Sequence, residues 1–177
     1  MSEPGPRERC RFWPAVFLAW LIFLALDFLS HATLLSSLWA KDLAALKSPE
    51  ELFRLIPFGY LSFLLLTLLI GSVYVRLYPE GGSPGIGLRF GMWFGLLFAA
   101  SNFLAWHSVF RLPVLFAALA NGVYWVEMTA VGLVFGYLMP LPSVGRRGWI
   151  LAGIAFMILM VGIIIQSLGA GAAGPGR

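Results

Sequence analysis

Two carboxylic acids, Asp27 and Glu127, lie inside long apolar runs of the sequence and are its clearest candidates for chemistry. Asp27 is the only charged residue in 12–40, and Glu127 is the only charged residue in 112–145. Both runs are long enough to cross a bilayer as helices. A carboxylate in hydrocarbon costs several kcal/mol unless it is paired, protonated or facing water. Both acids are therefore candidates for a functional site.

Other polar residues fall at a similar depth in the predicted spans. With a helical rise of about 1.5 Å per residue, Asp27, Thr67, Asn102 and Glu127 lie near the middle of four different spans. His31 is one turn from Asp27 on the same helix face. We expect these five residues to form a polar network inside the membrane, with Glu127 protonated and hydrogen-bonded to Asn102 or His31.

This network has two interpretations. If Asp27, Asn102 and Glu127 point inward together, they could form a proton relay, a cation site or a pocket for a polar substrate. Alternatively, they hydrogen-bond to neighbouring helices and fix the register of the bundle. The residue types allow both.

The two histidines raise the question of a metal or haem site. His31 and His107 are equally far along their predicted spans, so a haem between them, or a divalent metal with Asp27, is conceivable. Two histidines are a small ligand set, and Cys10 is the only cysteine. We therefore expect no cofactor, with haem or metal as the alternative.

Small residues recur every four positions in two predicted spans. Gly87, Gly91 and Gly95 form one such face, and Gly132 and Gly136 form the other. This spacing allows close approach of another helix. The sequence leaves open whether the contacting helix belongs to the same chain.

The composition determines the class of protein. The chain has 177 residues, of which 60% are hydrophobic and 11% are charged. Soluble domains have about a quarter charged residues. The sequence predicts an all-α, polytopic membrane helix bundle with a polar seam at mid-membrane. A flexible segment, 1–11, precedes one transmembrane domain, 12–168, and a disordered tail, 169–177, follows it. The predicted spans are 12–38, 55–78, 88–109, 115–138 and 149–168.

The basic residues predict the orientation in the membrane. They occur at the ends of the spans, so the net charge of +4 does not indicate nucleic-acid binding. More Lys and Arg residues fall on the side of the N-terminus than on the opposite side. We expect a cytoplasmic N-terminus and an external C-terminus.

Two short motifs carry a resemblance to a known group of proteins. The segment Asp27-Phe-Leu-Ser-His31-Ala-Thr-Leu-Leu and the segment Gly87-Leu-Arg-Phe-Gly91 resemble small bacterial four-span membrane proteins of unknown function, over residues 27–138. The resemblance implies a bacterial inner membrane and a compact four-helix unit to which a fifth span is added. It implies no activity and no catalytic residue.

The function expected from the sequence is not enzymatic, because no nucleophile triad, phosphate loop or metalloprotease motif is present. The first hypothesis is an accessory or assembly subunit of a larger membrane complex, in contact with lipid and with other subunits or copies of itself. The alternative is a small proton-coupled carrier that uses Asp27, Asn102 and Glu127. The third is an electron-transfer subunit with haem at His31 and His107.

Overall fold

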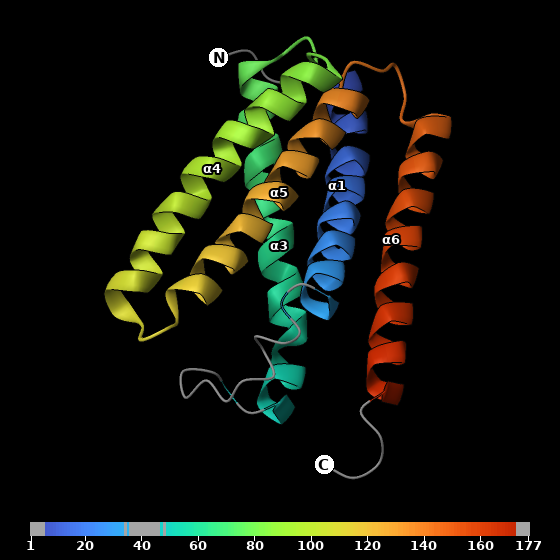
Figure 1. The fold of residues 1–177 in the computed structure, drawn as a ribbon. Helices are drawn as coiled ribbons and strands as arrows, with labels where there is room; N and C mark the ends of the chain where they lie inside the picture. The colour runs from blue at the N-terminus through green and yellow to red at the C-terminus, as the bar shows by residue number, and fades with distance from the viewer. Residues whose placement is uncertain (1–5, 34, 36–46, 48, 173–177) are drawn as a thin grey trace.

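The computed structural model describes residues 6–33, 35, 47 and 49–172, and every regular element in this part of the chain is a helix (Figure 1). Five helices are long and apolar enough to cross a membrane, which confirms the predicted all-α bundle. They are α1 (Pro6–Ala32), α3 (Pro49–Leu77), α4 (Pro84–Val109), α5 (Val114–Leu138) and α6 (Gly145–Ala172).

The helices extend beyond the predicted spans at several ends. α1 begins at Pro6 and α6 continues to Ala172, so both helices include residues that the sequence analysis assigned to a flexible segment and to a disordered tail. Hydrocarbon thickness limits the apolar run, whereas the helix can continue into the headgroup region. At its other end α1 stops at Ala32, where the Thr33 hydroxyl donates a hydrogen bond of 2.6 Å to the Leu29 carbonyl. The rest of the predicted first span lies mostly outside the described residues.

Successive helices run in opposite directions. α1 starts at the upper end of the bundle in Figure 1, and α6 finishes at the lower end. The α3–α4 and α5–α6 connections lie at the upper end, and the α4–α5 connection lies at the lower end. The two ends of the helical part therefore lie at opposite ends of the bundle.

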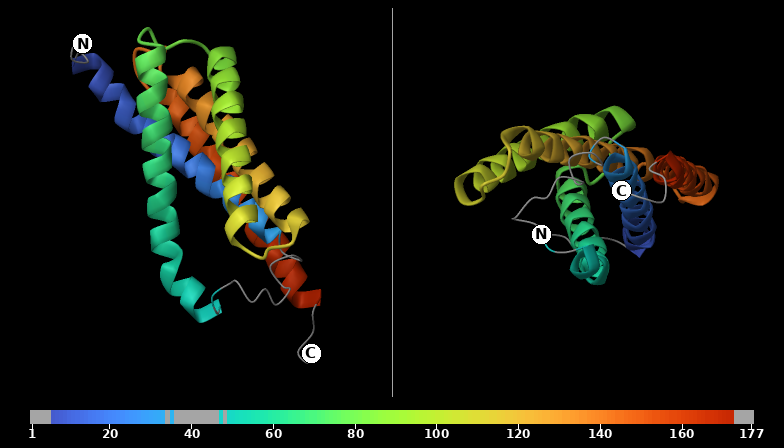
Figure 2. Two further views of the ribbon diagram at one scale, coloured as in Figure 1. Left: turned by 90° about the vertical axis from the view of Figure 1, so that its left-hand side faces the viewer. Right: turned by 60° about the horizontal axis from the view of Figure 1, so that its bottom comes forward.

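α1 is the central helix of the bundle. It packs against α3, α5 and α6, whereas α6 packs mainly against α1. In the right-hand view of Figure 2, α3 and α1 lie side by side, with the α4–α5 pair across them and α6 at the edge; the left-hand view shows that α1 crosses α3 at an angle. The main hydrophobic core lies between α1, α3 and α5 and includes Phe23, Ile70, Tyr74 and Phe135, all of which are fully buried.

Glycines bring α4 and α5 into backbone contact, and these two helices form the most extensive contact of the bundle. A methyl group added to Gly91 would lie 2.7 Å from the Met128 carbonyl oxygen, and one added to Gly132 would lie 2.6 Å from the Gly91 Cα. Gly87 and Gly136 meet each other in the same way, and Gly95 faces Met128 and Trp125. The small-residue faces of α4 and α5 thus pack on each other within one chain.

Arg11 joins the beginning of α1 to the end of α5. Its Nη1 atom donates hydrogen bonds of 3.1 Å to the Met139 carbonyl and 2.7 Å to the Leu141 carbonyl. The last carbonyls of a helix have no partner within the helix and carry partial negative charge. A guanidinium group supplies both hydrogen-bond donors and a positive charge. Arg11 therefore stabilises the upper end of the bundle.

Candidate functional site

Glu127 lies at the middle of α5 and is completely enclosed by the protein. Its exposed fraction is 0%, and neither carboxylate oxygen has a hydrogen-bond partner among the described residues. The expected hydrogen bonds from Asn102 or His31 to Glu127 are therefore wrong. Buried polar groups are nearly always hydrogen-bonded, so an exception of this kind needs an explanation.

Asp27 of α1 is the charged group that interacts with Glu127, and His31 lies beside Asp27 on the same helix. The His31 Nε2 atom lies 3.1 Å from the Asp27 Oδ1 atom, as their spacing of one turn predicts. Asp27 is close enough to both Glu127 and Tyr124 to interact with them electrostatically. We call Asp27, His31, Tyr124 and Glu127 the acid cluster. It lies between α1 and α5.

Aromatic side chains from three helices enclose the acid cluster. The Phe23 ring of α1 stacks on the Phe63 ring of α3, with centroids 4.6 Å apart. Tyr124 makes edge-to-face contacts with Phe63 and with Phe98 of α4, at 6.4 and 6.2 Å. Such pairs fix ring orientation. They hold Tyr124 beside the two acids and keep the region around them apolar.

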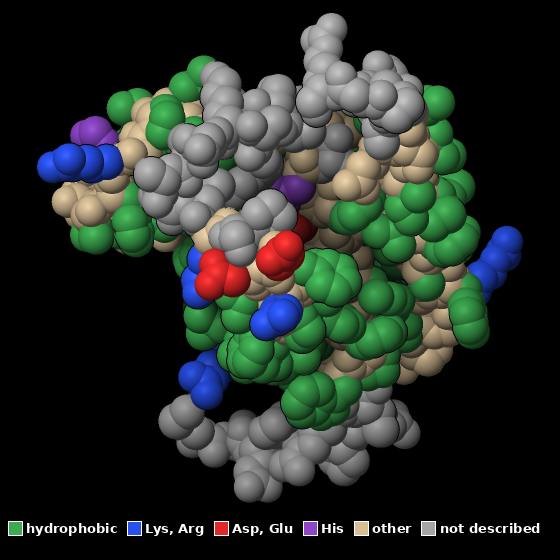
Figure 3. Space-filling view, turned by 90° about the horizontal axis from the view of Figure 1, so that it is seen from below, with side chains coloured by type: hydrophobic (Ala, Val, Ile, Leu, Met, Phe, Trp, Pro, Cys, Tyr) green, Lys and Arg blue, Asp and Glu red, His purple; other side chains and the backbone are tan. Residues whose placement is uncertain are grey.

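The side chains of the acid cluster become more exposed from Glu127 of α5 to Asp27 and His31 of α1. Glu127 is 0% exposed, and the exposed fractions of the Asp27 and His31 side chains are 14% and 36%. α1 ends well short of the lower ends of α3 and α6 in Figure 1 and Figure 2. Seen from below, an acidic and a histidine side chain lie recessed near the centre of the face, with several Lys and Arg side chains at its rim (Figure 3). Among the described residues, exposure thus increases from Glu127 to His31, which lies in the last turn of α1.

The remaining residues of the predicted network, Asn102 and Thr67, form hydrogen bonds that do not involve Glu127. The Asn102 amide donates a hydrogen bond of 2.8 Å to the side-chain oxygen of Asn121, and Asn121 donates one of 2.8 Å to the Ala117 carbonyl. Thr67 is fully buried, but its hydroxyl donates to the Phe63 carbonyl of its own helix. The Asn102–Asn121 pair links α4 to α5, whereas the Thr67 hydrogen bond stays within α3. The single seam expected from the sequence is divided into separate polar contacts.

The histidines lie on helices that have no extensive contact with each other. His31 belongs to α1, and His107 is an exposed residue of α4 that stacks on Phe103 with a centroid distance of 6.1 Å. No group of three or more His, Cys, Asp or Glu residues within the described residues is arranged to hold a metal ion. A haem or metal at the histidines gains no support from this arrangement, and the absence of a cofactor stays an expectation.

Sequence reasoning missed Asn121 and Tyr124. Asn121 lies eight residues after the end of the 110–113 turn, and Asn102 lies eight residues before the start of the same turn. In a helical hairpin this symmetry brings the two positions to one depth, so the pair had a detectable signal. Tyr124 is one turn from Glu127, but no property of the sequence distinguishes it from the other tyrosines.

Comparisons with known proteins found no protein-family model, no curated protein and no solved structure that matches this chain.

Proposed function

We propose that this multi-pass membrane protein is a small proton-conducting carrier whose proton-binding residue is Glu127. The observation that carries the proposal is the complete burial of a carboxyl group without a hydrogen-bond partner among the described residues. An ionisable residue inside a membrane protein is most often part of an ion or proton pathway. A purely structural acid would be expected to bind a neighbouring helix, as Asn102 does.

The order of burial supports a route for the proton. A proton on the Glu127 carboxyl group passes to the Asp27 carboxylate, which leaves Glu127 ionised and Asp27 neutral. Asp27 then passes the proton to the imidazole of His31, whose Nε2 atom is 3.1 Å away. His31 is the most exposed of the three groups and exchanges the proton with water at the lower end. Histidine suits this step because it gains and loses a proton near neutral pH.

The packing on the other side of Glu127 supports a carrier rather than an open channel. Between Glu127 and the upper end of α5, buried Met128, Val131, Phe135 and Leu138 pack against the neighbouring helices. In the part of the chain that the structure describes, apolar side chains thus separate the acid cluster from the upper surface. Alternating access requires a site that opens to one side at a time.

Proton flux into liposomes tests this proposal. Purified protein is reconstituted with a trapped pH-sensitive dye, and a potassium diffusion potential drives protons inward. We expect wild-type protein to acidify the interior faster than empty liposomes do. Glu127→Gln should fall to the rate of empty liposomes, because an amide cannot release a proton. The matched control is Glu80→Gln, which changes an exposed acid in the α3–α4 loop and should conduct like wild type.

Two results would contradict the proposal. One is equal flux through wild-type and Glu127→Gln protein, and the other is a wild-type rate no higher than that of empty liposomes. Elution of Glu127→Gln as a single peak at the wild-type position in size-exclusion chromatography shows that a lost flux is not a lost fold.

The outer side of α6 favours a second candidate function, that of an accessory or assembly subunit. α6 packs mainly against α1, and its Trp149, Phe156 and Met157 are 82%, 61% and 65% exposed. Such a surface suits another membrane protein, although it suits lipid equally well. The glycine faces of α4 and α5 no longer support this function, because they pack on each other. We therefore place it second.

A further inference from the structure

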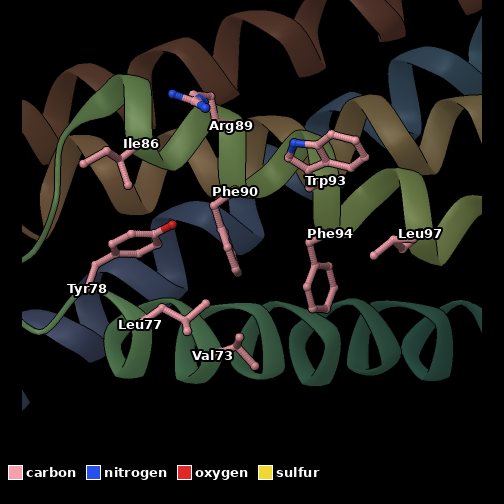
Figure 4. Close-up of a pocket in the computed structure, with 9 residues that line it drawn as sticks. All are labelled: Val73, Leu77, Tyr78, Ile86, Arg89, Phe90, Trp93, Phe94 and Leu97. Carbon is pink, nitrogen blue, oxygen red and sulfur yellow. The ribbon is translucent and has the colours of Figure 1, made fainter.

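A groove on the outside of the bundle lies between α3 and α4, away from the acid cluster. Its volume is about 580 Å³, which is within the range of small-ligand sites. α3 and α4 share far fewer contacts than α4 and α5 do, although a short loop joins them. Figure 4 shows Phe90 and Phe94 pointing from α4 toward Val73 and Leu77 of α3.

The loop above the groove is held in place, so the groove has a fixed upper end. The buried Tyr74 hydroxyl donates a hydrogen bond of 3.0 Å to the Gly81 carbonyl. Gly81 and Gly82 have φ angles of 92° and 70°, which residues with a side chain rarely adopt. The Ser83 hydroxyl then accepts a hydrogen bond from the Ile86 amide and begins α4.

The chemistry of the groove changes along its length. Tyr78 and Ile86 lie at the end nearest the loop, and Arg89 follows at the level of Phe90, on the side of α4 that faces away from α3 (Figure 4). Arg89 is exposed and makes no ion pair with another described residue. Below it the lining is apolar and aromatic as far as Leu97. From Arg89 to Leu97 the α4 axis rises about 12 Å, close to the depth of one leaflet of a bilayer whose apolar core is about 30 Å thick.

We propose that the α3–α4 groove is a binding site for one anionic glycerophospholipid. The Arg89 guanidinium binds the lipid phosphate, and an acyl chain lies along Phe90, Phe94 and Leu97. A planar guanidinium group forms two parallel hydrogen bonds with a phosphate group, and basic pockets between transmembrane helices bind anionic headgroups. The groove opens sideways from a bundle whose helices are long and apolar enough to cross a membrane, so a lipid can enter it directly from the bilayer.

Native mass spectrometry of the full-length protein tests the site. Detergent-solubilised protein is mixed with equal amounts of phosphatidylglycerol and phosphatidylcholine, and the bound lipid is identified by mass. We expect wild-type protein to retain one phosphatidylglycerol molecule in preference to phosphatidylcholine. Arg89→Gln should weaken phosphatidylglycerol binding about tenfold, because it removes a charge-assisted pair of hydrogen bonds. The matched control is Arg76→Gln, an exposed arginine of α3 that does not line the groove and should bind lipid like wild type.

A second variant tests the apolar part of the groove without changing any charge. Val73→Trp fills the space between the helices and should prevent lipid retention. The proposal is overturned if wild-type protein retains no lipid, or if Arg89→Gln and Arg76→Gln weaken binding equally. It is also overturned if Val73→Trp protein keeps its lipid, since the acyl chain then lies elsewhere. Proton flux through Arg89→Gln should equal that of wild type, because the groove is separate from the acid cluster.

Discussion

Glu127 weakens the folded state, because its carboxyl group gives up hydration and gains no hydrogen bond from the described residues. Burial of an unsatisfied polar group costs about 1–3 kcal/mol. We therefore expect Glu127→Leu to raise the free energy of unfolding by roughly 1–3 kcal/mol while it abolishes proton flux. The sequence alone predicts the opposite, since a hydrogen-bonded Glu127 would leave its partners unsatisfied when replaced by Leu. The measurement is thermal unfolding in detergent, followed by the change in helical circular dichroism.

The outcome distinguishes a functional acid from a structural one. Destabilisation by Glu127→Leu would mean that the acid is hydrogen-bonded in the folded protein, and the carrier proposal would lose its main support. Infrared spectroscopy provides a check, because a neutral carboxyl group and a carboxylate absorb at different frequencies. The band of a neutral carboxyl group should be absent from the spectrum of Glu127→Gln protein if Glu127 contributes it in wild type.

At the residue scale, the sequence predicts contacts along one helix better than contacts between helices. The Asp27–His31 contact follows from helical periodicity. The partners of Asn102 and Glu127 depend on how each helix is rotated about its axis, and packing of the whole bundle sets that rotation. The Asn102–Asn121 bond was partly predictable, because the turn between them fixes their relative depth.

At the scale of the helix, α5 contains a matched pair of glycines that tests the α4–α5 contact. A methyl group on Gly132 would lie 2.5 Å from the Gly87 carbonyl oxygen, whereas one on Gly122 would meet no atom within 4 Å. We expect Gly132→Ala to reduce the free energy of unfolding by about 1–3 kcal/mol, the usual cost of overpacking. Gly122→Ala should change it little. Thermal unfolding of both variants in the same detergent gives the comparison.

Equal stability of the two alanine variants would show that α4 and α5 are separated more widely than the structure has them.

The α4–α5 contact could be predicted only in part from the sequence. Glycine at every fourth position identifies a face for close packing, but it does not identify the helix that packs there. The position of the spans was easier to predict, because Arg and Lys residues flank the apolar runs. The ends of the helices were harder, because a helix can continue beyond the apolar run that predicts it.

At the scale of the whole molecule, the exposed side of α6 predicts the behaviour of the protein on extraction. If the protein is an accessory subunit, gentle extraction from native membranes gives a complex far above the 19.4 kDa mass of the chain. If it is an independent carrier, it gives a monomer with bound lipid. Blue native electrophoresis followed by mass spectrometry distinguishes the two results. We expect the independent form, because the acid cluster is complete within one chain.

The Arg11 contact has a consequence for biosynthesis. α1 is synthesised before α5, and the carbonyls that Arg11 binds belong to residues 128 and 130 positions later in the chain. α1 is also the helix around which α3, α5 and α6 assemble. About 130 residues must therefore be synthesised after Arg11 before its two acceptor carbonyls exist. A chain that stalls before Met139 therefore contains both Asp27 and Glu127 but lacks the contact that ties the beginning of α1 to the end of α5.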